Sequence, residues 1–535
     1  MKKRLALLLA SAMLIGALGG CGSSSTTADS SSEGSTETVT TTDTTAESSE
    51  VSGDDKYGGS VTLTLATKPA TYFLPFSVST ADRKAAYPAI ETLGRMDEEG
   101  NINGWLAESF EVDSEALTAT IVLKEGINFS DGTPLNAEAV IWNFDKMNEG
   151  GKIGELGTPI SYEAVDDKTV KLTYDKWGND WEALLGDVCI YCPAAFEENG
   201  ADWASINPVG TGPYVVKEYV KDSHITYARN ENYWIEGQPY LDEISINWLT
   251  DPTAQISAFS NGEIQLLETS NKTVADALKG SNENHAEQSP NTGSIKYAMF
   301  ASAVEDSPFY NENVRLAVMH SIDWEGYANA LTFGDGIAVN QFGVPGAWSY
   351  DESVGFVEFD TELAKQMLAE AGYPDGFSTV ITTQEEYNDS AVLLQDSLLK
   401  IGITAEIKVL SNADFSAQKK EGTYDGGIIV GQGASKMDFT NNYIRLYSSE
   451  GTSYQAMMTH PEDYEEALFG ARAAKTIEEK KELLKVASVK LVQEHALIFP
   501  MGVIFPYIYQ DVKLQDTGVG SNQDSWTPEA MYLEK

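Results

Sequence analysis

The chain has 535 residues, of which 42% are hydrophobic and 10% aromatic, so it is long and apolar enough to build more than one core. Its 81 acidic residues outnumber its 36 basic residues and give a formal net charge of −45. Most of such a chain is repelled by a phosphate backbone, which argues against nucleic-acid binding.

Residues 1–20 are typical of a lipoprotein signal peptide. Three bases at positions 2–4 precede an apolar run from Leu5 to Leu18, which is too short to read as a membrane-spanning helix. The run ends in Leu-Gly-Gly-Cys, which resembles the bacterial lipobox. We expect cleavage before Cys21 and a lipid on its thiol, anchoring the protein at the outer face of the cell membrane, or in the periplasm if the envelope has an outer membrane.

Residues 21–57 are predicted to be a disordered tether behind the lipidated cysteine. Ser, Thr and acidic residues dominate this stretch, and large apolar side chains are almost absent. Such a segment cannot bury enough surface to offset the entropy of ordering.

From residue 58 onward, strand and helix patterns alternate, which predicts a mixed α/β fold. Apolar residues recur at every second position in Ser60–Leu65, the first strand candidate. Further strands are expected at 118–123, 169–173, 243–248, 404–409 and 427–430. Helices are expected at 136–147, 313–320, 361–371, 390–401 and 477–494, where the apolar spacing is three and four residues. Asn136 is placed to cap one helix and Gly372 to end another.

Cys189 and Cys192 are spaced Cys-x-x-Cys. The spacing is compatible with a disulfide and also occurs in redox and metal sites. A zinc ribbon needs a second pair, and a thioredoxin-like motif needs a different local pattern, so we interpret the pair as structural and leave the disulfide open.

The sequence shows no assembled reaction centre. It lacks a Gly-x-Ser-x-Gly elbow, a His-Glu-x-x-His motif, a Walker loop and a calcium-ligand loop, and its five histidines are scattered. The Gly-Thr-Gly-Pro-Tyr segment at 210–214 has no lysine, and Pro213 removes an amide, so a structural turn is favoured over a phosphate cradle. We therefore expect no enzyme activity, cofactor or metal site.

Six motifs, in this order behind the lipobox, carry a resemblance to a known family. They are Leu106-Ala-Glu-Ser-Phe110, Phe129-Ser-Asp-Gly-Thr-Pro134, Gly210-Thr-Gly-Pro-Tyr214, Arg229-Asn-Glu-Asn-Tyr-Trp234, Val314-Arg-Leu-Ala-Val318 with Ile322-Asp323, and Ala369-Glu-Ala-Gly-Tyr-Pro-Asp-Gly376. In these residues the chain resembles the large solute-binding proteins of ABC importers, extracellular solute-binding family 5, which includes peptide, nickel and oligosaccharide receptors.

The resemblance implies a periplasmic-binding-protein-like fold of type II, cluster C, with two α/β lobes and an extra domain on the first. We expect lobe one at 58–88, 205–290 and 503–535, the extra domain at 89–204 and lobe two at 291–502. The lobes would close on a small solute, such as an oligopeptide or oligosaccharide, and deliver it to permease and ATPase subunits. A monomer is expected.

In the family's peptide receptors, an aspartate binds the ammonium of the ligand and an arginine binds its carboxylate. Aligning on the motifs places Glu385 at the arginine position and Ser435 at the aspartate position, while Tyr387 and Asp438 are retained. An unpaired peptide carboxylate near Glu385 would be penalised. The sequence therefore predicts a neutral polyol or a cation as ligand in preference to a simple dipeptide.

Tyr72, Phe76, Phe300 and Gln432 are predicted to form cleft walls, because aromatic faces stack on sugar rings. Core packing is the alternative for each aromatic residue. Two alternative functions stay open, an oligosaccharide receptor of the same fold and a sensory receptor that is not coupled to import.

Overall fold

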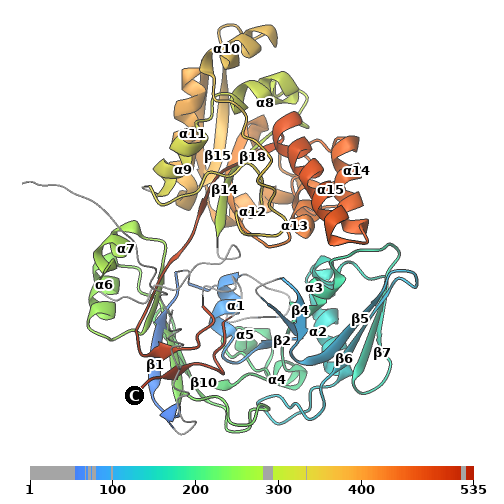
Figure 1. Cartoon of the computed structure of the whole chain (residues 1–535), viewed down its shortest axis with the longest axis vertical. Helices are drawn as coiled ribbons and strands as arrows, with labels where there is room; N and C mark the ends of the chain where they lie inside the picture. The colour runs from blue at the N-terminus through green and yellow to red at the C-terminus, as the bar shows by residue number, and fades with distance from the viewer. Residues whose placement is uncertain are drawn as a thin grey trace, which may run out of the picture. The chain divides into compact units, whose positions relative to one another are not determined.

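The computed structural model describes residues 55–66, 68, 69, 74, 80–97, 100–280, 293–332, 334–519 and 526–535. All of these residues lie within one compact unit, Val51–Lys535. Within these residues, the helices are too short or too polar to cross a membrane. Figure 1 shows the arrangement of the elements.

Lobe one is the part built on a six-stranded mixed sheet. The strand order is β10 (Tyr214–Val220), β11 (His224–Arg229), β12 (Glu243–Asn247), β1 (Ser60–Thr64), β13 (Leu266–Thr269) and β19 (Tyr507–Gln510). Strand β1 runs parallel to both of its neighbours, and the other pairs are antiparallel. Its helices are α1 (Thr80–Ala86), α6 (Pro252–Ser260) and α7 (Lys272–Leu278), and β20 (Leu514–Gln515) pairs with β21 (Tyr532–Leu533).

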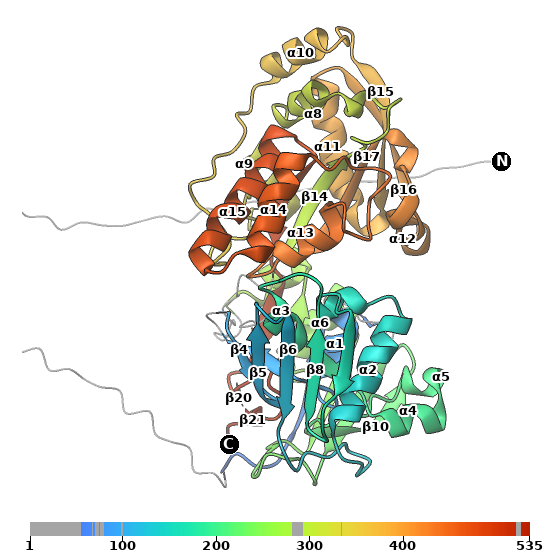
Figure 2. The same ribbon diagram turned by 90° about the vertical axis from the view of Figure 1, so that its right-hand side faces the viewer.

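The extra domain is the part built on a four-stranded antiparallel sheet (Figure 2). Its order is β5 (Ala107–Asp113), β6 (Thr118–Leu123), β8 (Thr169–Thr173) and β7 (Ser161–Ala164). Two short ribbons pair β2 (Glu91–Thr92) with β9 (Cys189–Ile190) and β3 (Gly94–Met96) with β4 (Ile102–Gly104). The helices are α2 (Ala137–Glu149), η2 (Ile153–Leu156), α3 (Trp181–Gly186), α4 (Pro193–Asn199) and α5 (Ala201–Ala204).

Lobe two is the part built on a five-stranded sheet. The order is β16 (Ile403–Leu410), β15 (Phe377–Gln384), β17 (Ile428–Ala434), β14 (Ser294–Phe300) and β18 (Ile498–Ile504). Its α-helices are α8 (Glu312–Met319), α9 (Trp324–Thr332), α10 (Thr361–Glu370), α11 (Asn388–Lys400), α12 (Asn412–Glu421), α13 (Thr440–Tyr447), α14 (Glu462–Ala473) and α15 (Ile477–Val489). Short helical turns are η4 (Pro308–Tyr310), η5 (Glu385–Tyr387), η6 (Tyr424–Gly426) and the π-turn η7 (Lys490–Glu494).

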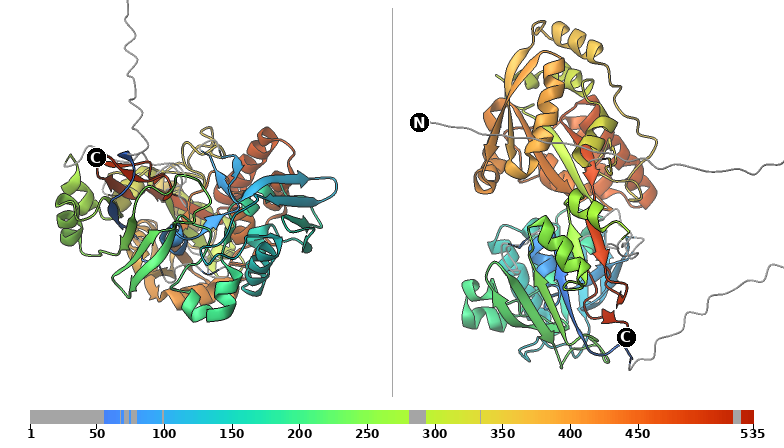
Figure 3. Two further views of the ribbon diagram at one scale, coloured as in Figure 1. Left: turned by 90° about the horizontal axis from the view of Figure 1, so that it is seen from below. Right: turned by 90° about the vertical axis from the view of Figure 1, so that its left-hand side faces the viewer.

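The hydrophobic cores follow this division. One cluster of buried side chains lies wholly in lobe two, and a second joins the inner faces of lobe one and the extra domain. A small third cluster packs α6 and α7 against β13 and β19 within lobe one. Strands β18 and β19 belong to different sheets, yet only Phe505 and Pro506 separate them along the chain. In the right-hand view of Figure 3, the red ribbon near the C-terminal end of the chain passes from one sheet to the other.

The expected mixed α/β fold is confirmed, and the strands and helices predicted from the apolar spacing are present with shifts of a few residues at their ends. Asn136 caps α2, because its side chain accepts a hydrogen bond from the Ala139 amide. Gly372 has a φ of +98°, the left-handed conformation expected just after a helix.

A buried carboxylate, Glu91, ties lobe one to the extra domain. Its Oε1 accepts hydrogen bonds from Trp105 Nε1 (2.8 Å) and the Tyr233 hydroxyl (2.7 Å). Its Oε2 accepts from the Thr211 hydroxyl (2.7 Å) and Trp234 Nε1 (2.9 Å). The motifs at 210–214 and 229–234 therefore converge on one side chain. Burial raises the pKa of Glu91, against the effect of Arg95 and these hydrogen bonds.

The two glycines beside Thr211 allow this close approach. A Cβ on Gly210 would lie 2.4 Å from the Ala89 carbonyl oxygen, and one on Gly212 would lie 2.6 Å from the Ala89 carbonyl carbon. The Asn230 side chain also donates to the Gly212 carbonyl at 2.9 Å. These contacts support the structural interpretation of the Gly-Thr-Gly segment.

Replacing Glu91 with Gln is expected to destabilise the protein. The amide nitrogen of Gln would face two of the four donors, and a buried donor without an acceptor costs roughly 1–3 kcal/mol. We expect a lower urea midpoint with an unchanged slope. The matched control is Glu111→Gln, at an exposed position of β5. Equal midpoints for the two variants would contradict the assigned role of Glu91.

Candidate ligand-binding pocket

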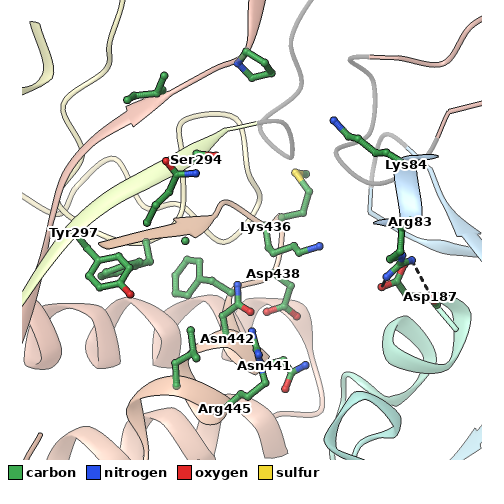
Figure 4. A pocket seen from close by; sticks show the side chains of 18 of the residues that line it. Arg83, Lys84, Asp187, Ser294, Tyr297, Lys436, Asp438, Asn441, Asn442 and Arg445 are labelled. Carbon is green, nitrogen blue, oxygen red and sulfur yellow. Dashed lines mark hydrogen bonds and ion pairs between the residues drawn. The ribbon is translucent and has the colours of Figure 1, made fainter. Parts of the chain in front are cut away.

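A pocket of about 1210 Å³ is lined by residues of lobe one, the extra domain and lobe two. Its volume lies above the range of roughly 300–1000 Å³ that is usual for small-molecule sites. In Figure 4, Arg83, Lys84 and Asp187 face the pocket from one side, and Lys436 and Asp438 face it from the other.

The lining reverses the charge balance of the chain. Of the described residues that line the pocket, ten are Lys or Arg and seven are Asp or Glu, whereas acids outnumber bases 81 to 36 in the whole sequence. The basic residues are Lys68, Arg83, Lys84, Arg95, Lys152, Lys272, Lys296, Lys419, Lys436 and Arg445. Over a quarter of the chain's cations therefore lie at one pocket.

Several of these cations are already neutralised by carboxylates. The pairs, with their N···O distances, are Arg83 with Asp187 (2.5 Å), Lys84 with Glu268 (2.7 Å), Arg95 with Glu529 (2.6 Å) and Lys272 with Asp335 (2.8 Å). Such pairs fix the orientation of the walls and leave little net charge for a ligand.

Lys296 of β14 differs from these paired cations. Its side chain is 8% exposed, and its Nζ lies 4.1 Å from the centre of the Tyr387 ring, in cation–π geometry. Desolvation lowers the pKa of Lys296 to about 8, while Glu386 and Asp389 act in the opposite direction. The amine therefore changes charge near physiological pH.

Lys419 of α12 and Arg445 of α13, together with Lys152 of the extra domain, form a cationic group in the lining. Burial and the charges of Arg445 and Lys152 lower the pKa of Lys419 to about 8. The Lys419 Nζ lies 5.5 Å from the centre of the Tyr454 ring. Within the described part of the chain, no carboxylate oxygen lies within 4.0 Å of the charged nitrogens of these three residues.

Aromatic side chains back this cationic group. Tyr297 and Tyr454 are buried, and their hydroxyl oxygens are 3.0 Å apart. The Phe342 ring centre lies 6.0 Å from that of Tyr297 and 5.5 Å from that of Tyr447. Gly431 leaves room for the hydroxyl of Tyr297, since a Cβ there would lie 2.9 Å from it. The wall is therefore closely packed.

Hydrogen bonds connect the extra domain directly to α14 of lobe two. The Asn179 amide donates to the Arg472 carbonyl (2.9 Å), and its side chain donates to the carbonyls of Ala471 (2.8 Å) and Ala474 (3.0 Å). Next to it, the Asp180 carboxyl is buried, and burial raises its pKa. These contacts are polar, and of the residues in them and beside them Asp180 lines the pocket.

Three of the residues predicted from the sequence to contact ligand line the pocket. They are Tyr387, Gln432 and Asp438. Asp438 already accepts hydrogen bonds from Lys480 Nζ (2.5 Å) and from the Thr440 amide (2.9 Å). Tyr387 and Gln432 have exposed surface facing the cavity. That these side chains bind a ligand stays a prediction.

Three other expectations differ from the structure. Phe300 is 0% exposed and packs against Phe309 and Phe499 in the core of lobe two, so it does not form a cleft wall. Glu385 is exposed but outside the lining, where its neighbour Glu386 lies instead. Ser435 is buried, and its hydroxyl donates to the Gly293 carbonyl. The argument for a neutral or cationic ligand therefore loses its basis.

Cys189 and Cys192 are both buried and no disulfide joins them, so the bond that the sequence left open is not formed. The Cys192 Sγ donates to Asp131 Oδ2 at 3.1 Å, and burial raises the pKa of Cys192 to about 11, which makes it unreactive. Cys21, Tyr72 and Phe76 lie outside the described residues.

The sequence analysis did not predict that Lys296, Lys419 and Arg445 line the pocket. A signal exists for Lys296, which is the charged residue in the otherwise apolar strand Ser-Ile-Lys-Tyr-Ala-Met-Phe. No comparable signal exists for Lys419 and Arg445, which occupy polar helices far from Lys152 in sequence. In the described residues, no group of three or more His, Cys, Asp or Glu side chains is arranged to hold a metal.

Comparisons with known proteins agree with the geometry. A family model described as bacterial extracellular solute-binding proteins, family 5, matches residues 101–454. The chain is 29% identical to heme-binding protein A of Haemophilus influenzae, covering 72% of this chain and 76% of that protein. It is 25% identical to the dipeptide-binding protein of Escherichia coli, covering 76% and 82%.

A solved structure shares the fold. The periplasmic binding protein DppA of Helicobacter pylori, in complex with the peptide STSA, matches with a TM-score of 0.77 and 21% identity. The match covers 90% of this chain and 99% of that chain. The two-lobed type II fold expected from the motifs is thereby confirmed.

Labelling of Lys296 by an amine-reactive ester should follow an unusual pH profile. Because only the neutral amine reacts, and burial lowers its pKa to about 8, labelling should reach half its maximum near pH 8, against about 10.4 for an unperturbed lysine. Mass spectrometry of the peptide measures the rate, and Lys296→Met removes the signal. A midpoint near 10.4 would show that Lys296 is not desolvated.

Proposed function

Since the chain belongs to the bacterial extracellular solute-binding proteins of family 5, we propose that it captures a small solute in the pocket and delivers it unaltered to an ABC importer. The permease and ATPase of that importer would be its partners. The chain itself would carry out no chemical step.

One observation carries this proposal, namely that a single pocket takes its walls from lobe one, the extra domain and lobe two. A solute that contacts all of them binds best when the walls are together, so binding shifts the population towards the closed state. A permease that recognises the closed state can then distinguish loaded from empty receptor.

Tyr387, Gln432 and Asp438 are the proposed ligand contacts among the residues predicted from sequence. The relatives named above bind heme and dipeptide, so family membership leaves the ligand class open. The ligand class must therefore be inferred from the residues that line the pocket.

We also propose the domain limits of 58–88, 205–290 and 503–535 for lobe one, 89–204 for the extra domain and 291–502 for lobe two. Sheet membership supports them, because the strands of each sheet fall within a few residues of these ranges. We propose a monomer anchored by a lipid on Cys21, which the Leu-Gly-Gly-Cys sequence supports.

The purified protein should retain a solute from a culture extract and return it chemically unchanged. A solute at 100 times its Kd should raise the free energy of unfolding by about 2.7 kcal/mol, measured as a shift of the thermal midpoint. Deleting the gene should lower uptake of that same solute.

Two results would count against this function. Conversion of the solute during incubation would indicate an enzyme. Unchanged uptake together with a lost transcriptional response would indicate the sensory alternative.

Replacing Cys21 with Ser should release the protein from the membrane fraction, because the hydroxyl cannot accept the thioether-linked diacylglycerol. Immunoblotting of membrane and soluble fractions measures the release, with Ser23→Ala as the matched control beside the same site. Full membrane retention of Cys21→Ser would refute the lipid anchor.

A further inference from the structure

Lys152, Lys419 and Arg445 form a cationic group whose members come from different bodies. Lys152 belongs to the extra domain, just before η2, whereas Lys419 and Arg445 lie on α12 and α13 of lobe two. All three line the pocket. The group therefore extends across the division between the two large hydrophobic cores.

The surroundings of Lys419 leave its charge uncompensated. The charges of Arg445 and Lys152 act on it with the same sign, and its desolvation adds to their effect. The neighbouring ring of Tyr454 gives only a distant cation–π contact at 5.5 Å. Elsewhere in the pocket, Arg83, Lys84 and Lys272 all have carboxylate partners.

This unpaired group occurs in a chain where acids are more than twice as frequent as bases. Desolvated like charges repel each other more strongly than exposed ones, so they reduce stability unless a counter-ion is present. In the described residues no carboxylate supplies that counter-ion within ion-pair distance. The negative charge of a bound ligand would offset this repulsion.

We propose that an anionic group of the captured solute, a carboxylate or a phosphate, sits among Lys152, Lys419 and Arg445 and bridges the extra domain to lobe two. The inference deepens the solute-capture function proposed above and rests on it. The bound anion offsets the repulsion across the pocket, so an anionic solute favours the state in which these walls are together.

The arrangement has opposite consequences for the empty and the loaded protein. Removing one cation relieves repulsion when no ligand is bound, but it removes an ion pair when the anion is present. A lysine that only supports the fold would behave differently, because its loss would lower the stability of the empty protein.

The test uses the full-length protein and four variants, Lys419→Gln, Arg445→Gln, Arg445→Lys and the control Lys475→Gln. Lys475 is exposed and lies outside the pocket. Citrate and inorganic phosphate are titrated separately by calorimetry against a sodium chloride blank of equal ionic strength, with glycerol as the neutral probe. The separate titrations distinguish a carboxylate from a phosphate ligand group.

We expect citrate or phosphate to bind, and Lys419→Gln and Arg445→Gln each to weaken that binding at least tenfold. Arg445→Lys should keep most of the affinity, and Lys475→Gln should stay within twofold of the parent. The empty Gln variants should melt at the same temperature as the parent or higher. Unaltered affinity in both Gln variants, a lower melting temperature of the empty variants, or no binding of either anion would overturn the anion site.

Mass spectrometry of the solute retained from a culture extract separates this inference from the function on which it rests. A retained solute without any acidic group, whose uptake still depends on the gene, would leave the receptor function intact and reject the anion site. Absence of a retained solute together with unchanged uptake would reject the receptor function itself.

Discussion

Each side of the pocket is supported by its own hydrophobic core, and no buried apolar cluster of the described residues spans both sides. Several contacts between the extra domain and lobe two are polar, such as the hydrogen bonds of Asn179 to α14. Polar contacts exchange with water at little net free energy, whereas buried apolar surface does not. This division allows the walls to separate without unfolding either part.

The charge of the lining differs in sign from that of the whole chain. The sequence is strongly acidic as a whole, while the lining concentrates Lys and Arg. At physiological ionic strength, charges more than about 8 Å apart in solvent are largely screened, so the acidic exterior has little influence on a solute inside the pocket. Under the proposed function, the cations of the lining would act on a bound solute more strongly than the acidic exterior does.

Glu91 shows how family motifs act at a distance from the ligand. It gathers donors from Trp105, Thr211, Tyr233 and Trp234, which come from three separated segments. Its neighbour Arg95 lies against Trp105, 3.4 Å from the ring centre, and also lines the pocket. The motif residues thus support the part of the pocket wall that carries Arg95.

Periodicity predicted most of the strands and helices, because burial on one face imposes a regular spacing on the chain. It could not predict which residues face the pocket. Glu385 and Glu386 are adjacent on one short helical turn, and the sequence alone does not show which of the two faces the pocket. Phe300 lies at the end of β14 that enters the core, whereas Lys296 lies four residues earlier on the same strand at the pocket.

Phe505 and Pro506, which join β18 to β19, limit how the two sheets can move. Three Cα–Cα steps separate Ile504 from Tyr507 and span at most about 11 Å, so the strand ends cannot move far apart. The two sheets are therefore held close together at this point, while a change of φ and ψ in the connection can alter the angle between them. Pro506 also lines the pocket, so a solute that contacts it would lie beside the connection between the two sheets. A small change of angle at this connection displaces the parts of the pocket wall that lie farthest from it by a larger distance.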